Sequence, residues 1–195
     1  MELSPRARER LERIGSLTST EQQQMQRERE VEEALSGYFT GAIDAEGLWQ
    51  RVKALADAHG AEAVRQAQLR ILQTLRLQMA DDDFEKRKAG LLALESLKKG
   101  GKHSAIELLL GSIVSLRRRY NEVKQQAYDQ LRQQVEAQVH AAGDQARRQG
   151  MFVDTASALD AAIKGSPEWR DFMTRHDASG QKTLDDYLGR IKALL

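Results

Sequence analysis

The chain has 195 residues, of which 41% are hydrophobic, 5% aromatic and 30% charged, with a formal net charge of +1 at pH 7. This balance gives no overall field that would attract nucleic acid or a membrane, and the lack of cysteine excludes disulfide scaffolds, cysteine zinc sites and thiol catalysis. The scarcity of aromatic residues and the abundance of Ala and Leu favour helices over sheets.

Residues 1–40 are expected to form a charged N-terminal helical arm. The pair Ser4-Pro5 opens a short predicted helix from Arg6 to Ile14, and a capping box at Thr18-Ser-Thr-Glu21 opens a second helix that runs to about Tyr38. The first part of this second helix consists almost entirely of Gln, Arg and Glu, so it can bury little apolar surface. We therefore expect residues 1 to about 30 to be mobile or to lie on a partner.

Residues 41–150 are expected to form a helical bundle. The most regular amphipathic helix begins after Asp44, which caps it, and closes at His59-Gly60. A further helix is predicted from Ala61 to about Ala80, with apolar residues on two faces. The next is predicted over residues 84–99, behind a run of three aspartates that suits a helix N-terminus.

The longest predicted helix runs from a capping box at Ser104-Ala-Ile-Glu107 to about Gln149, with no proline inside it. About 45 residues rise roughly 68 Å, whereas a compact chain of this length has a diameter on the order of 40 Å. The helix is therefore expected to project from its bundle. Its first part, up to Leu116, is apolar on more than one side and is expected to be buried.

From Lys124 onward only a narrow apolar stripe remains on this helix, among Gln, Arg, Glu and Asp residues. Such a stripe is expected to lie on one neighbour and to face water elsewhere. A partner helix fits it better than a membrane surface does, because a membrane-binding helix presents bulky Phe or Trp residues opposite its cations. The residues expected to bind the partner are Ala127, Leu131, Val135, Val139 and Ala142.

Residues 151–195 are expected to form a small C-terminal segment of three helices. These are predicted over residues 155–164, 167–176 and 183–195, and a Ser-Pro pair opens the second of them. The sequence Asp177-Ala-Ser-Gly180 is expected to form the turn before the last helix.

No residue pattern in the chain points to catalysis, a cofactor or a metal. The four histidines lie far apart, and none belongs to a His-Glu-x-x-His or Glu-x-x-His ligand pattern. Phosphate-binding glycine loops and nucleophile elbows are also lacking. With no apolar run of 18 residues and no signal-peptide pattern, the sequence predicts a soluble, cytoplasmic protein with no enzymatic activity.

Basic residues around the start of the long helix offer an alternative, a surface that contacts the phosphates of nucleic acid. Three consecutive helical arginines spread over about 200° of the circumference, however, so they cannot all face one duplex. No aromatic residues alternate with the basic ones to stack on bases. The residues concerned are Lys98, Lys99, Lys102, Arg117, Arg118 and Arg119.

The sequence therefore predicts an all-α fold, an irregular helical bundle organised around one very long helix. The expected function is that of a non-enzymatic interaction protein: an adaptor, scaffold or assembly subunit that homo-oligomerises or binds a helical partner in a coiled-coil manner. In a structural variant of this interpretation, the Gln-rich second helix folds back along the long helix and covers its stripe within one chain. The alternative function is that of a nucleic-acid-binding regulator.

Overall fold

The computed structural model describes residues 18–148 and 154–195, which form seven α-helices and contain no strand. This arrangement confirms the predicted all-α class. Within the described residues, none of the helices combines the length and the apolar character that crossing a membrane requires. The helix expected from Arg6 to Ile14 lies outside the described part of the chain.

Contacts between residues divide the chain into two compact units. The first comprises the residues up to Leu75, Met79–Glu107 and Lys192–Leu195, and the second comprises Arg76–Gln78 and Leu108–Ile191. These boundaries differ from the three segments expected from the sequence, 1–40, 41–150 and 151–195. Each unit is built from pieces that are distant in sequence.

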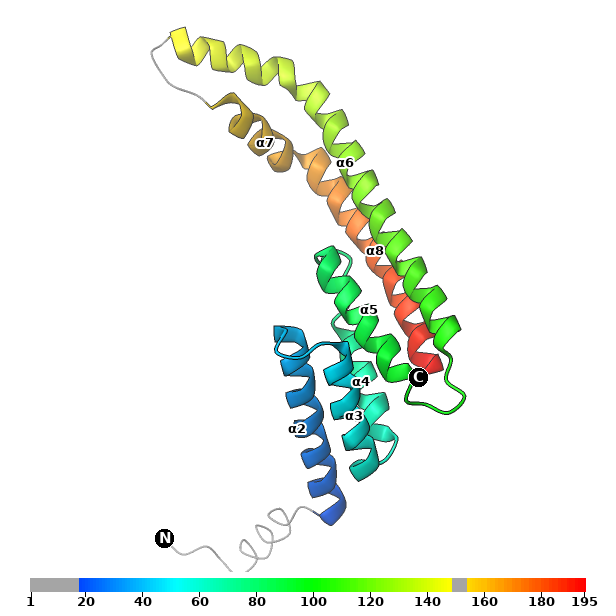
Figure 1. The fold of residues 1–195 in the computed structure, drawn as a ribbon. Coiled ribbons are helices and arrows are strands. Elements are labelled where there is room, and N and C mark those ends of the chain that lie inside the picture. Colours follow the sequence, from blue (N-terminus) through cyan, green and yellow to red (C-terminus); the bar gives the residue numbers. More distant parts are fainter. Residues whose placement is uncertain (1–17, 149–153) are drawn as a thin grey trace, which may run out of the picture. The chain divides into compact units, whose positions relative to one another are not determined.

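Four helices form most of the first unit: α2 (Ser19–Thr40), α3 (Ala45–His59), α4 (Glu62–Gln73) and α5 (Asp81–Glu95). Helix α3 packs against the other three, and α4 also contacts α2 and α5 (Figure 1). Burial of each large apolar side chain stabilises the unit by roughly 1.5–3 kcal/mol. The largest fully buried side chains of this unit are Tyr38, Phe84, Leu35, Leu48, Ile71, Leu75, Leu91, Leu94 and Ile106.

Helix α2 is part of this first core rather than a separate arm over its whole length. It begins with the predicted capping box, in which Thr18 accepts a hydrogen bond from the backbone N–H of Glu21 and donates its own backbone N–H to the Glu21 carboxylate. Further along, Glu30 Oε2 lies 2.8 Å from His59 Nε2, and Glu32 Oε1 lies 2.9 Å from Arg70 Nε. These contacts join α2 to α3 and α4.

A buried carboxylate explains why α5 ends at Glu95 instead of continuing to Lys99 as predicted. Glu95 is 1% exposed and accepts hydrogen bonds from Gln68 Nε2 at 2.7 Å and from the backbone N–H of Lys102 at 2.6 Å, and Lys98 Nζ lies 3.1 Å away. Burial alone raises the pKa of Glu95, but these donors outweigh it and hold that pKa below its usual range. A side chain on Gly101 would lie 2.9 Å from the same carboxylate. The chain therefore turns around Glu95 before the next helix begins.

Helix α4 is shorter than predicted, because it ends at Gln73 and not near Ala80. The residues that follow leave the helix, yet Leu75 and Leu77 are still buried. The carbonyl of Leu77 accepts a hydrogen bond from Arg117 Nε at 3.1 Å, so a side chain replaces the bond that a helix would have supplied. These apolar residues belong to a loop that buries Leu75 and Leu77 and exposes the residues between and after them, Arg76 and Gln78.

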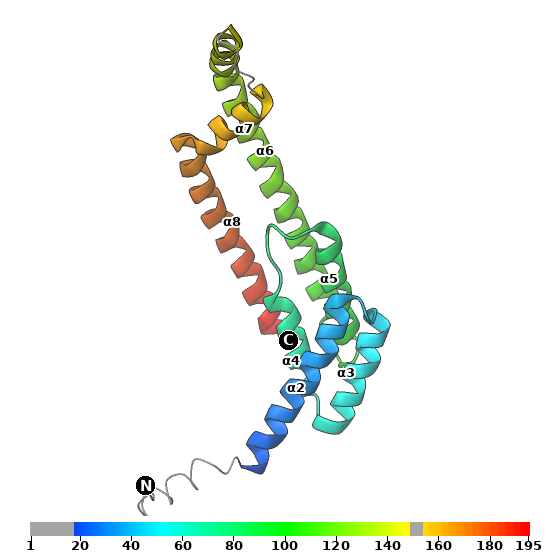
Figure 2. The ribbon, with the colours of Figure 1, turned by 90° about the vertical axis from the view of Figure 1, so that its left-hand side faces the viewer.

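The second unit is a helical hairpin. Helix α6 runs without interruption over 46 residues, His103–Arg148, and enters this unit at Leu108. Helix α8 (Pro167–Leu194) lies antiparallel beside it, and α7 (Thr155–Gly165) lies along its distal part (Figures 1 and 2). The long helix is thus confirmed, although it begins at His103, so that Ser104 lies in its first turn instead of capping it.

The prediction of two helices after Pro167 was wrong, because α8 is a single helix of 28 residues. The expected turn at Asp177-Ala-Ser-Gly180 is helical throughout. A Cβ atom on Gly180 would lie 2.8 Å from Leu77 Cδ1 and 3.1 Å from Tyr120 Cδ2. Gly180 therefore marks a close approach between packed elements and not the end of a helix.

Candidate functional site

The predicted partner-binding residues lie on the distal part of α6, in the second unit. Leu131, Val135 and Val139 are partly covered, as is Ala127, whereas Ala142 is exposed. The helices beside the distal part of α6 in this unit are α7 and the beginning of α8 (Figure 1). Helix α2, which was considered as an intramolecular cover for the stripe, packs on α3 and α4 in the first unit.

Burial differs sharply between the two parts of α6. The proximal part contributes Ile106, Leu110 and Ile113 to the interior, each with no exposed surface. Leu108 departs from the prediction that this part is covered on more than one side, because it is 74% exposed. Among the residues from 121 to 148 whose burial the structure describes, the one buried residue is Gly143, which has no side chain. The apolar side chains of the distal part are therefore at most partly covered.

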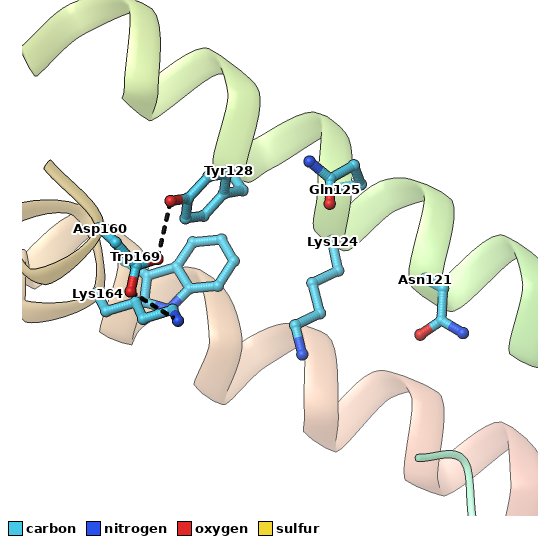
Figure 3. A pocket seen from close by; sticks show the side chains of 7 residues that line it. All are labelled: Asn121, Lys124, Gln125, Tyr128, Asp160, Lys164 and Trp169. Carbon is cyan, nitrogen blue, oxygen red and sulfur yellow. Dashed lines mark hydrogen bonds and ion pairs between the residues drawn. The ribbon is translucent and has the colours of Figure 1, made fainter. Parts of the chain in front are cut away.

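A groove of about 510 Å³ lies at the proximal end of the predicted stripe, where α6 meets α7 and the beginning of α8 (Figure 3). This volume is within the range of ligand pockets in proteins. Four of the side chains come from one face of α6, at positions i, i+3, i+4 and i+7. The groove is lined by Asn121, Lys124, Gln125, Tyr128, Asp160, Lys164 and Trp169.

Helix caps fix the α7 and α8 side of the groove. Asp154 caps α7 by accepting from the backbone N–H groups of Ala156 and Ser157. Ser166 accepts from the backbone N–H of Trp169 at 3.1 Å and so opens α8, as the Ser-Pro pair predicted. These two caps set the places of Asp160, Lys164 and Trp169.

Asp160 is shared by two donors. The Tyr128 hydroxyl donates to Oδ1 at 2.8 Å, and Lys164 Nζ lies 2.9 Å from Oδ2 (Figure 3). The hydrogen bonds from Lys164 and then from Tyr128 lower the pKa of Asp160. The same contacts raise the pKa of Lys164 and that of Tyr128. All three groups therefore hold their ordinary charge states at neutral pH, and the carboxylate is already engaged.

Lys124 is the second cation of the groove. Its partly buried side chain extends into the space between α6 and α8, beside the amides of Asn121 and Gln125 (Figure 3). Gln125 donates to Asp129 at 3.0 Å, on its own helix. Lys124 has no ion pair or hydrogen bond with any described residue. The lining thus carries two lysines and one aspartate, an excess of positive charge.

Aromatic rings form the inner wall of the groove. Trp169 is 8% exposed, and its ring meets that of Tyr128 edge to face with centroids 5.8 Å apart. Behind this wall, the Phe172 ring packs on Trp169 with a centroid separation of 5.6 Å. The groove therefore combines an apolar wall with an amide-rich, positively charged rim, a combination suited to binding and orienting a ligand. In the described part of the chain, no three His, Asp or Glu side chains are placed to hold a metal ion.

A second polar cluster lies between α6 and α8. The Tyr120 hydroxyl donates to Asp177 and accepts from Gln78 Nε2. His176 stacks on the Tyr120 ring with centroids 4.3 Å apart, and its Nε2 lies 2.9 Å from the Tyr120 carbonyl. Burial and the bond to Asp177 raise the pKa of Tyr120 to about 12. Reasoning from sequence missed this cluster, because its members are up to 99 positions apart and match no known spacing.

The residues of the nucleic-acid alternative fall into two groups. Arg117 is 4% exposed and donates to the carbonyl of Leu77, and Lys98 lies between Glu95 and the carbonyl of Leu195. These two side chains are engaged within the chain. Lys99, Lys102, Arg118 and Arg119 are exposed, and Arg118 pairs with Glu122 at 2.8 Å.

Comparison with known proteins places the chain in a family. No curated protein and no solved structure matches it. The model of the Family of unknown function (DUF6657) matches residues 49–193. This range includes most of the first unit, the groove and α8 up to Ala193. The chain therefore belongs to the Family of unknown function (DUF6657).

Proposed function

We propose that the protein is a non-enzymatic helical interaction protein, an adaptor, scaffold or assembly subunit that acts through the distal part of α6. The observation that carries this proposal is that no described side chain between residues 121 and 148 is buried, since the one buried residue described there is a glycine, Gly143. Leu131, Val135 and Val139 are only partly covered there. A further helix laid along this edge would complete their burial.

The energetics favour such a contact. Full burial of a Leu or Val side chain is worth roughly 1.5–3 kcal/mol, and part of that gain is still available at each of these positions. The small exposed residues Ala141 and Ala142 let a second backbone approach closely. The partner is a helix with an apolar face, supplied by a second copy of this chain or by another protein, and the contact has the character of a coiled coil.

Light scattering after size exclusion tests this proposal on the full chain. A charge placed in the stripe should abolish self-association, because Asp at position 131 would have to be desolvated in the contact. We expect a mass above that of the monomer for the unchanged chain and a monomer for Leu131→Asp. Gln133→Asp is the matched control, since residue 133 is exposed and lies about 200° around the helix from residue 131.

Far-UV circular dichroism should show unchanged helical content in both variants, because residue 131 is not fully buried. A monomer at every concentration for all three proteins would contradict self-association. If Leu131→Asp and Gln133→Asp dissociated to the same extent, the contact would lie elsewhere than on the stripe.

A further inference from the structure

We propose that the groove of α6, α7 and α8 binds an acidic side chain of the protein partner, with Lys124 as the group that pairs with its carboxylate. This inference rests on the proposed function and gives the partner a chemical requirement: a Glu or Asp beside the apolar residues that cover the stripe. The groove adjoins the stripe, because Lys124 and Tyr128 flank Ala127 on α6. One partner helix can therefore reach both.

Lys124 is a cation without an acidic partner among the described residues. Its side chain is partly buried and extends into the groove (Figure 3). The one acidic residue in the lining, Asp160, is engaged by Lys164 and by the Tyr128 hydroxyl. A visiting carboxylate would pair with Lys124 without displacing any contact within the chain.

Two amide side chains line the groove together with Lys124. The Asn121 amide faces the groove (Figure 3), and Gln125 keeps one amide hydrogen after donating to Asp129. A carboxylate accepts several hydrogen bonds at once, and those that involve a charged group are the stronger ones. The two amides and Lys124 lie on one face of α6, where they can meet the same ligand group.

Trp169 and Tyr128 line the groove with aromatic carbon. The methylene groups of a Glu side chain would pack on it and displace water from that part of the groove. Exclusion of water strengthens an ion pair, because the effective dielectric constant falls. The volume of about 510 Å³ holds one side chain together with the backbone that carries it.

The composition of the groove favours a carboxylate over a phosphate. Phosphate sites use arginine forks, several cations or backbone N–H groups at a helix N-terminus. This groove has one available lysine, and Asp160 stands close enough to line the same space. Its negative charge would repel a doubly charged phosphate more than a singly charged carboxylate.

The test uses Trp169 as its own reporter. The chain contains two tryptophans, so Trp49→Phe leaves Trp169 as the single fluorophore. The probes are the capped peptides acetyl-Ala-Glu-Glu-Ala-amide and acetyl-Ala-Gln-Gln-Ala-amide. We expect a saturable fluorescence change with the Glu peptide that weakens as salt is raised from about 50 mM to about 300 mM, and none with the Gln peptide.

Lysine variants then locate the contact. Lys124→Gln should weaken binding of the Glu peptide by about fivefold, the upper end of the loss expected for one partly exposed ion pair. Lys182→Gln, at an exposed lysine of α8 outside the groove, should leave the affinity within about twofold. If Trp49→Phe does not fold, anisotropy of a fluorescein-labelled Glu peptide on the chain with both tryptophans replaces this readout.

Three results would overturn the inference: an equal response to both peptides, an unchanged affinity in Lys124→Gln, or no response to the Glu peptide at about 10 mM, where even a contact of a few kcal/mol is detected. None of these changes the light-scattering comparison of Leu131→Asp with Gln133→Asp. Failure of the groove is thereby distinguished from failure of the interaction proposal.

Discussion

A single methyl group at Gly90 should reveal how tightly the first unit is packed. Gly90 is buried within α5, where alanine normally stabilises a helix by about 1 kcal/mol relative to glycine. Here a Cβ atom would lie 2.7 Å from Tyr38 Cε1 and 3.0 Å from Tyr38 Cζ. The Tyr38 ring is 1% exposed, and its hydroxyl donates to the carbonyl of Lys86, so the ring cannot move without losing contacts.

The sign of the effect follows from three magnitudes. Overpacking a core costs about 1–3 kcal/mol, loss of the Tyr38 hydrogen bond costs about 1 kcal/mol, and the gain in helix propensity returns about 1 kcal/mol. Gly90→Ala should therefore lower the free energy of unfolding by about 1–3 kcal/mol. For a chain of this size the melting temperature should fall by roughly 2–4 °C for each kcal/mol.

The assay is urea and thermal unfolding followed by far-UV circular dichroism at 222 nm. Gly37→Ala, on α2 in the same unit, is the matched control, because a Cβ atom there meets Ile43 Cγ1 and Arg51 Nη1 at ordinary contact distances of 3.6 and 3.8 Å. This variant should raise stability by up to about 1 kcal/mol. If Gly90→Ala were as stable as Gly37→Ala, the Tyr38 ring would have room to move and the packing argument would fail.

Two predictions concern titration. Because the folded chain holds the pKa of Glu95 below its ordinary value, the stability that this group provides is present above about pH 4.5 and is lost as the pH falls further. Glu95→Gln should be less stable than the unchanged chain at pH 7 and should lose less stability between about pH 5 and pH 3. Thermal unfolding across this range measures both changes, and parallel curves of melting temperature against pH for the two proteins would contradict the prediction. Because the pKa of Tyr120 is raised to about 12, stability should fall between about pH 10 and pH 12, where the unfolded chain releases this proton and the folded chain keeps it. The difference in absorbance at 295 nm between the unchanged chain and Tyr120→Phe should titrate near pH 12, and titration near pH 10 would show an unperturbed phenol.

The elements with strong local signals were predicted correctly. The capping box at Thr18, the Asp44 cap, the Ser-Pro opening of α8 and the long unbroken helix depend on neighbouring residues, and each appears in the structure. The partial cover of the stripe on α6 also follows from the local pattern, since the residues around it are polar. These features needed no knowledge of what the rest of the chain does.

The features that escaped prediction depend on contacts between distant residues. Gly180 resembles a turn signal, and only the approach of Leu77 and Tyr120 shows why glycine stands inside a helix there. Leu77 fits the helical pattern of the sequence, but it lies in a loop where its carbonyl accepts a hydrogen bond from Arg117. The groove was missed for the same reason, because Tyr128 and Asp160 meet only when α7 folds back along α6.

The division of the chain into two units has a consequence for its synthesis and for the design of fragments. The first unit includes residues 192–195, whose Leu195 carbonyl accepts from Lys98 Nζ at 3.2 Å, and the second includes residues 76–78. A ribosome must release almost the whole of this sequence before either unit has all its pieces. Separate expression of residues up to 107 and from 108 onward would leave Lys98 without one acceptor and Gly180 without Leu77, so each fragment would lack part of its own unit.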